Sequence, residues 1–222
     1  MVLQMYFQYG ETELSYLMKK DRKLAHVIEQ VGMIERKTEP DLVAAVIHHI
    51  IGQQISTKAQ ATVWRRLQEL LGQINADTVL AAGADQLQSC GISFRKANYL
   101  LDFATRVKCG DFVPDKLRQM DDAEAIAALS ALKGIGVWTA EMLLLFSLQR
   151  PDIFSFGDFG LQRGLRMLYR HREIDRPLFE KYRRRFSPYG STASLYLWAV
   201  AGGALPDLTD PKQQTTTRRA SR

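Results

Sequence analysis

Residues 132–146 read LKGIGVWTAEMLLLF, and two glycines in this stretch separate the end of one apolar segment from the start of another. Gly134 and Gly136 lack Cβ atoms, so the backbone of this turn can approach a phosphate closely. The backbone amides that open a helix at Trp138 would offer the phosphate donors and a favourable dipole. The stretch therefore predicts a helix-hairpin-helix that binds phosphate without reading sequence, although an ordinary tight helix-helix connection uses the same glycines.

The rest of the chain reads as a series of helices. Residues 38–41, Thr-Glu-Pro-Asp, are typical of a helix start, and the apolar residues that follow recur with a period of 3.6. Gly52 ends that helix, Ser56 caps the next one, and Gln53 and Gln54 lie in the turn between them. Further helices are expected at residues 77–82, 84–89, 96–108, 122–131, 138–148, 159–170, 177–185 and 191–201. No series of alternating apolar and polar segments predicts β-hairpins, so the expected fold class is all-α.

The composition excludes several classes of protein. The chain has 222 residues, 46% hydrophobic and 24% charged, which is typical of a globular protein, and its longest apolar stretches are too short to cross a bilayer. Cys90 and Cys109 are the only cysteines, so no four-thiolate iron–sulfur cluster can form. The N-terminal residues do not read as a secretory signal, so we expect an intracellular protein of the cytoplasm and nucleoid, or of the nucleus in a eukaryote.

The positive charge lies in the C-terminal third of the chain. The net charge of the whole chain is +6, whereas residues 150–222 carry 14 Lys and Arg against seven Asp and Glu. A basic segment of this kind favours a polyanionic partner, most simply a nucleic acid. A solvated helix face has a similar composition, so charge alone leaves both interpretations open.

Three motifs together resemble one protein family. The first is the hairpin stretch followed by Gly157-Asp158-Phe159, the second is Ile51-Gly52-Gln53-Gln54-Ile55-Ser56, and the third is CGISFRKA at residues 90–97. In this order and spacing they resemble the HhH-GPD superfamily of DNA glycosylases, in particular the 3-methyladenine DNA glycosylase II branch. The resemblance implies two helical subdomains, with the DNA and the active site in the cleft between them.

The expected domain organisation has four parts. Residues 1–39 form an N-terminal helix that packs with the C-terminal subdomain, and residues 40–135 form a central helical bundle. Residues 136–205 hold the second helix of the hairpin, the segment of Asp158 and the C-terminal helices. Residues 206–222, rich in Thr, Gln and Arg, have little apolar surface to bury and are expected to form a flexible basic tail.

Asp158 is the catalytic residue that the resemblance implies. Cleavage of an N-glycosidic bond develops positive charge on the deoxyribose, which a fixed carboxylate stabilises, and the same carboxylate can orient or deprotonate water. Spacing alone reads Asp158 as the cap of a helix starting at Phe159, and the two roles are compatible. Trp138 stands where bifunctional relatives have a lysine, so the amine nucleophile of a lyase is missing and an abasic product is expected.

A flipped base is expected to enter an aromatic and largely apolar pocket. The resemblance places Trp138, Met142, Phe159 and Tyr189 there, and electron-rich rings would favour an electron-poor alkylated purine. Some members of the family have tyrosines at the positions of Met142 and Phe159, which leaves the preferred lesion open. Phe154 and Trp198 lie nearby in sequence and are interpreted as core residues.

The turn at Gln53 and Gln54 is expected to supply a wedge that fills the stack vacated by the flipped base. Gln54 matches the intercalating position of the family better than Gln53 does, although two glutamines can also simply solvate a turn. Other residues expected to contact DNA are Ser56, Lys133, Gly134, Gly136, Thr139 and Arg163. The resemblance also implies a monovalent cation, Na⁺ or K⁺, on the backbone carbonyls of Ser130, Leu132 and Ile135, and no other cofactor.

Together these expectations describe a monomeric, monofunctional glycosylase without a membrane partner. Its substrate would be double-stranded DNA that contains damaged bases, namely the alkylated purines 3-methyladenine and 7-methylguanine. Two alternatives remain open, a bifunctional glycosylase/lyase for oxidised bases and a non-enzymatic helix-hairpin-helix module that binds DNA.

Overall fold

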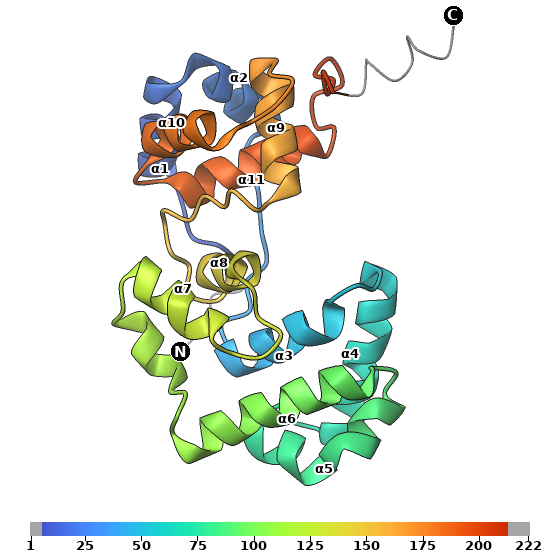
Figure 1. Ribbon diagram of the computed structural model, residues 1–222. Helices are drawn as coiled ribbons and strands as arrows, with labels where there is room; N and C mark the ends of the chain where they lie inside the picture. Colours follow the sequence, from blue (N-terminus) through green and yellow to red (C-terminus); the bar gives the residue numbers. More distant parts are fainter. Residues whose placement is uncertain (1–5, 213–222) are drawn as a thin grey trace, which may run out of the picture. The chain divides into compact units, whose positions relative to one another are not determined.

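The computed structural model describes residues 6–212, and within this range the regular secondary structure is helical (Figure 1). The described β structure is one isolated bridge between Tyr6 and Lys37. The expected all-α class is therefore confirmed. The described residues divide into two compact units. Unit 1 holds residues 39–148, and unit 2 holds residues 6–38 together with residues 149–212.

Unit 1 contains six α-helices and one short 3-10 helix. They are α3 (Leu42–Gly52), α4 (Thr57–Leu71), α5 (Ala76–Ser89), α6 (Phe94–Cys109), η1 (Pro114–Arg118), α7 (Asp122–Ser130) and α8 (Val137–Phe146). The two short helices expected at residues 77–82 and 84–89 are the two halves of α5, which is kinked at Gly83 with φ +69°. The core of the unit is formed where α6 packs on α5 and α3 and where α8 packs on α7 and α3.

Unit 2 contains five α-helices from the two ends of the chain. They are α1 (Glu11–Lys20), α2 (Arg22–Val31), α9 (Phe159–Tyr169), α10 (Arg176–Phe186) and α11 (Gly190–Ala201). The central helix α11 is buried along most of its length and packs on α9, α2, α1 and α10. The crossing of α9 and α11 depends on Gly164, because a Cβ there would lie 2.2 Å from the carbonyl oxygen of Leu197. This close crossing fixes the helix that begins next to Asp158.

Most helices begin where the sequence offers a side chain that can cap them. The oxygen of an Asp, Ser or Asn accepts a hydrogen bond from an amide of the first turn, which satisfies donors that the helix itself leaves unpaired. These capping residues are Asp21, Asp41, Ser56, Asn75, Ser93, Asp121, Asp158 and Asp175. The caps at Ser56 and Asp158 are those that the sequence predicted, whereas the cap of α3 is Asp41 and not Thr38, three residues earlier.

The structure divides the chain after Leu148 and not after residue 135. Helix α8 stays in unit 1 because its apolar side chains, among them Leu143, Leu144 and Leu145, are fully buried in packing against α7 and α3. Both helices of the hairpin therefore belong to one unit.

The expected tail also starts later than residue 206. Asp210 is buried and its carboxylate accepts two hydrogen bonds from Arg166 of α9, at 3.0 and 2.7 Å, so residues up to 212 are fixed on unit 2. The remainder of that expected tail, residues 213–222, lies outside the described residues, as do residues 1–5. No helix in the described range is long and apolar enough to span a bilayer.

Candidate functional site

The hairpin between α7 and α8 has different requirements at its two glycines. Gly134 has φ +84°, and a Cβ there would lie 2.6 Å from the ring of Tyr99, so only glycine fits without strain. Gly136 has φ −94°, and a Cβ there would meet nothing within 4 Å. No described side chain caps α8 at Gly136, and Val137 and Trp138 in its first turn are exposed. The open space at Gly136 and the uncapped amides fit an anion.

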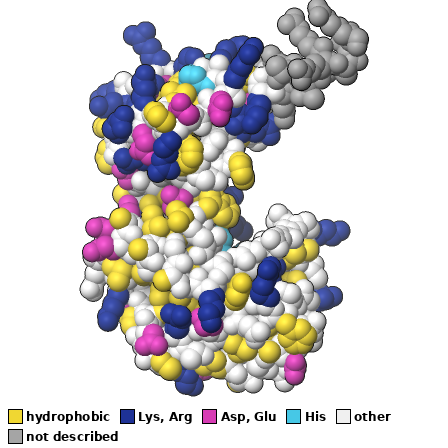
Figure 2. Space-filling model, viewed as in Figure 1, with side chains coloured by type: hydrophobic (Ala, Val, Ile, Leu, Met, Phe, Trp, Pro, Cys, Tyr) yellow, Lys and Arg dark blue, Asp and Glu magenta, His cyan; other side chains and the backbone are white. Residues whose placement is uncertain are grey.

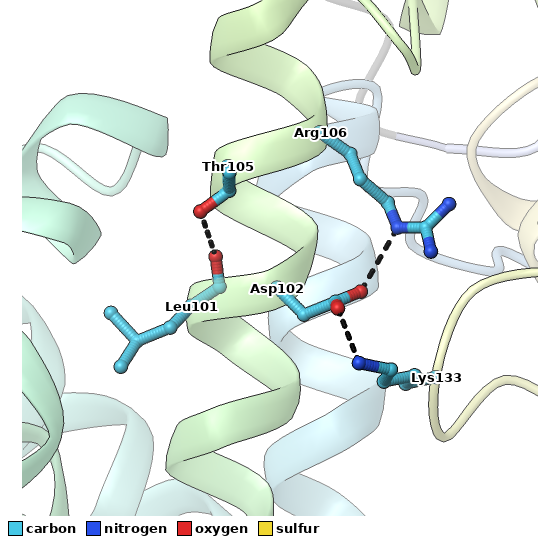
Figure 3. Close-up of polar contacts among 5 residues, drawn as sticks. All are labelled: Leu101, Asp102, Thr105, Arg106 and Lys133. Atoms are coloured by element: carbon cyan, nitrogen blue, oxygen red, sulfur yellow. Dashed lines mark hydrogen bonds and ion pairs between the residues drawn. The ribbon is translucent and has the colours of Figure 1, made fainter.

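Lys133 is held next to the hairpin by an ion pair (Figure 3). Its Nζ lies 2.6 Å from Oδ1 of Asp102, and Nε of Arg106 donates to Oδ2 of the same carboxylate at 3.0 Å. The hydrogen bond from Lys133, and after it the one from Arg106, lowers the pKa of Asp102 below its usual value. A phosphate that binds Lys133 would therefore compete with the carboxylate of Asp102 for its ammonium group.

The turn at Gln53 and Gln54 contacts the hairpin within unit 1. Nε2 of Gln53 donates to the carbonyl oxygen of Gly134 at 2.5 Å, whereas Gln54 is exposed and has φ +57°. Nζ of Lys96 donates to the carbonyls of Ile51 and Gln53, and burial lowers the pKa of this lysine. Of the two glutamines, Gln54 is therefore the one that the turn presents to solvent.

The other residues of unit 1 that were expected to bind DNA or a cation differ in their surroundings. Ser56 caps α4, and its Oγ accepts from the amide of Ala59 at 3.2 Å. Thr139 is buried, so its side chain offers little surface to a partner. Ser130 Oγ is buried and has no hydrogen-bond partner among the described residues, while the carbonyl of Leu132 accepts from the amide of Ile135 at 3.1 Å.

Asp158 lies at the start of α9 in unit 2, where its carboxylate is held by two donors. Its Oδ1 accepts from the amide of Leu161 at 2.6 Å and from the indole Nε1 of Trp198 at 2.8 Å. The residue is only 7% exposed. Gly160 makes room for the indole, since a Cβ there would lie 3.0 Å from Trp198 Cδ1. Asp158 thus caps its helix and is also a fixed, nearly buried carboxylate.

Trp198 was interpreted as a core residue, and this interpretation missed its polar role. Its ring packs against the core of unit 2, and its N–H donates a hydrogen bond to Asp158. Phe154 is a core residue as expected, buried with its ring centroid 4.9 Å from that of Phe179. No local pattern signals the Trp198 contact, because 40 residues separate the two partners.

Of the four residues expected to line the base pocket, two belong to unit 1 and two to unit 2. On α8 in unit 1, Trp138 is 44% exposed and Met142, one turn later, is buried. In unit 2, Phe159 is 86% exposed directly beside Asp158, and Tyr189 packs edge-on against Tyr16 with centroids 5.2 Å apart.

Asp152 is a second carboxylate in unit 2 that the sequence analysis missed. Its Oδ2 accepts from Ser187 Oγ at 2.6 Å, and its Oδ1 accepts from the amide of Gly190 at 3.0 Å. These two residues flank Tyr189 closely in the chain, so Asp152 fixes the segment that carries the tyrosine.

The basic segment of unit 2 is partly neutralised by its own carboxylates. Figure 2 shows Lys and Arg side chains gathered over unit 2. Arg166 is paired with Asp210 at 2.7 Å, and Arg163 Nε lies 3.9 Å from the same carboxylate. The hydrogen bond from Arg166 lowers the pKa of Asp210. Arg163 is the more exposed of the two arginines and keeps the better access to a phosphate.

Comparisons with known proteins place the chain in a family. A family model described as HhH-GPD superfamily base excision DNA repair protein matches residues 47–188. The DNA-3-methyladenine glycosylase 1 of Schizosaccharomyces pombe is 28% identical over 208 residues, which cover 91% of this chain and 90% of that protein. A putative DNA-3-methyladenine glycosylase of Bacillus subtilis is 29% identical over 67% of this chain and 55% of that protein.

Two solved structures share the fold over nearly the whole chain. A DNA-3-methyladenine glycosidase from Bacillus halodurans has a TM-score of 0.82 and 31% identity, with 95% of this chain and 99% of that one covered. The 3-methyladenine DNA glycosylase of S. pombe in complex with abasic DNA has a TM-score of 0.76 and 26% identity, with 89% and 99% covered. The family match spans more than half of the residues, and the chain belongs to the HhH-GPD superfamily of base excision DNA repair proteins.

Proposed function

We propose that this chain is a monofunctional DNA glycosylase that hydrolyses the N-glycosidic bond of alkylated purines, chiefly 3-methyladenine and 7-methylguanine, and leaves an abasic site. One observation carries the proposal: a nearly buried carboxylate, Asp158, is fixed by two N–H donors in a chain whose relatives are named DNA-3-methyladenine glycosylases. It acts as a monomer on double-stranded DNA, in whichever compartment holds that DNA.

Asp158 stabilises the positive charge that develops on the deoxyribose as the base leaves. A carboxylate held in place before the reaction stabilises this charge without reorganising, which is the main source of electrostatic catalysis. The same carboxylate can orient the attacking water or take its proton. Trp138 stands at the position where a lyase would have its amine, and Lys133 is paired with Asp102, so hydrolysis is the proposed outcome.

The hairpin holds a phosphate of the DNA through the amides that open α8, with added contacts from Lys133 and Arg163. Gln54 fills the gap that the flipped base leaves in the stack, because it is the exposed glutamine of its turn. Phe159 and Tyr189 beside the Asp158 segment, and Trp138 and Met142 on α8, keep their proposed role as contacts of the extruded base. Stacking of a cationic base on such rings is worth about 0.5–2 kcal/mol.

We also propose a monovalent cation at the hairpin, held by the backbone carbonyls of Ser130, Leu132 and Ile135. The buried Ser130 Oγ without a partner among the described residues supports it, because a cation with oxygen ligands would satisfy that atom. When bound, the cation would supply positive charge for a phosphate oxygen. No other cofactor is required, so base release is expected to persist in a chelator of divalent metals.

The decisive test compares wild type with Asp158→Asn on duplex DNA that contains 7-methylguanine. Asn caps a helix as well as Asp does, so the fold is expected to be retained, while loss of the charge is expected to lower the rate of base release at least about a hundredfold. Asp175→Asn, at the cap of α10 in the same unit, is the matched control and should release base at the wild-type rate. Equal release by wild type and Asp158→Asn would remove Asp158 from its role.

The same material separates the two alternative functions. A covalent protein–DNA adduct trapped by borohydride would indicate a lyase and contradict the monofunctional proposal. Retained DNA binding without release of base from any lesion would indicate a non-enzymatic module.

A further inference from the structure

One face of α6 contacts both segments that the proposed function uses in unit 1. Lys96, Tyr99 and Asp102 are spaced three residues apart and so lie on neighbouring turns of one side of the helix. Lys96 reaches the turn at Gln53, Tyr99 covers Gly134, and Asp102 binds Lys133. A single helix therefore contacts the Gln53–Gln54 turn and the hairpin at the same time.

Lys96 is the unusual member of this face because it is a buried lysine, 8% exposed, without a carboxylate bonded to its Nζ. Its Nζ donates to the carbonyls of Ile51 at 2.9 Å and Gln53 at 2.6 Å. These carbonyls lie at the end of α3, where backbone oxygens lack helical partners and a positive charge is favourable. Burying an ammonium is unfavourable unless it gains such hydrogen bonds. The two bonds therefore indicate that Lys96 has a specific role in holding this turn.

Contacts from α4 and from the hairpin also hold the turn at Gln53 and Gln54. The side chain of Gln60 on α4 packs directly over Gly52, and its Nε2 donates to the carbonyl of His48 at 2.9 Å. The side chain of Gln53 is bound to Gly134 in the hairpin. The bonds of this set hold the chain that leads into Gln54, at His48, Ile51 and Gln53, while Gln54 itself stays exposed.

We propose that Lys96 is a positioning residue for base flipping, which holds the Gln53–Gln54 turn in register with the phosphate-binding hairpin so that Gln54 is presented to the DNA already in place. This inference rests on the proposed function and adds the residue that aligns its wedge. Gln53 is the link between the two segments and not the wedge.

The expected effect follows from the ordering of the turn. A residue whose backbone must be ordered at the moment of binding lowers the equilibrium for insertion by about tenfold. Flipping is harder from a paired duplex than from an unpaired site. Loss of the Lys96 bonds should therefore slow excision from a duplex about tenfold and slow excision from an unpaired bubble much less.

The experiment uses Lys96→Met, which keeps most of the apolar stem and removes the ammonium. Lys108→Met is the matched control, because Lys108 lies on the same helix and makes an exposed pair with Asp77. Single-turnover release is measured for 7-methylguanine in a fully paired duplex and in an unpaired bubble, together with the thermal unfolding of each variant. For Lys96→Met, a duplex rate lowered about tenfold, with a bubble rate within threefold of wild type, supports the proposal.

Equal loss on both substrates, or no loss on either, overturns it, since a merely structural role would not distinguish paired from unpaired DNA. If Lys96→Met does not unfold cooperatively, Gln53→Leu takes its place, with the same expected pattern. If wild type releases no methylated base, the proposed function fails separately. In that case the proteins are mixed with duplex DNA that carries 2-aminopurine beside an abasic-site analogue, and the fluorescence of 2-aminopurine reports how far the stack is opened. Equal fluorescence with wild type and with Lys96→Met would contradict the positioning role of Lys96.

Discussion

Removal of the indole N–H that holds Asp158 should slow excision while the protein stays folded. Trp198→Phe keeps an aromatic ring in the core of unit 2 but deletes the donor that lies 2.8 Å from Asp158 Oδ1. A hydrogen bond to a charged group contributes about 1.5–3 kcal/mol. If this contribution is needed to hold the carboxylate during the reaction, the rate of base release falls by about 10- to 100-fold.

The assay is single-turnover release of 7-methylguanine from duplex DNA, with the free energy of unfolding measured in urea on the same protein. The smaller ring is expected to lower the stability by about 1–2 kcal/mol, which leaves the protein folded at the assay temperature. Trp64→Phe is the matched control, because Trp64 lies in unit 1 and packs on His48 with centroids 4.8 Å apart. A Trp198→Phe rate within threefold of wild type would refute the view that this bond positions Asp158.

Three further predictions concern the hairpin, a buried histidine and the C-terminal segment. Gly134→Ala should lower the free energy of unfolding by about 2 kcal/mol, because φ is +84° and the new Cβ meets Tyr99, whereas Gly136→Ala should leave stability unchanged and weaken DNA binding in titrations. Burial lowers the pKa of His49 to about 4. The free energy of unfolding should therefore fall by up to about 3 kcal/mol as the pH drops from about 6.5 to 4, because the unfolded chain binds a proton at His49 before the folded chain does. In urea titrations, His49→Gln should lack this part of the pH dependence. Asp210→Asn leaves a nearly buried arginine without its carboxylate and should lower the unfolding free energy by about 2–3 kcal/mol in the same measurement.

The parts of the fold that the sequence predicted are those that depend on neighbours in the chain. Helix starts at Ser56 and Asp158 were readable because a capping side chain binds an amide three residues later. The glycine turn at 134–136 is equally local. Membership of the HhH-GPD superfamily, inferred from three motifs, is confirmed by the family match.

The structure differs from the expected boundary at residue 135 and from the expected flexibility of residues 206–212, because both depend on packing between distant residues. Helix α8 reads as apolar on all sides, and nothing in that pattern says whether it packs with α7 or with the helices that follow. Asp210 lies in a polar segment whose composition predicts a flexible chain, yet it pairs with Arg166, 44 residues away, and Leu208 packs against the core of unit 2. These specific contacts outweigh the composition of the segment.

The choice between Gln53 and Gln54 shows how a site residue can become decidable only in three dimensions. In sequence the two are identical neighbours in one turn, and the resemblance to the family alone favours Gln54 as the wedge. In the structure, Gln53 would have to break its 2.5 Å bond to Gly134 before its side chain could enter DNA, and the partly buried carbonyl left behind would lose its donor. Gln54 has no such bond to break among the hydrogen bonds of the turn, and its left-handed backbone directs the chain so that its side chain is exposed. The two glutamines therefore differ in the structure: Gln53 binds the hairpin and Gln54 is exposed, which supports the proposal that Gln54 is the wedge.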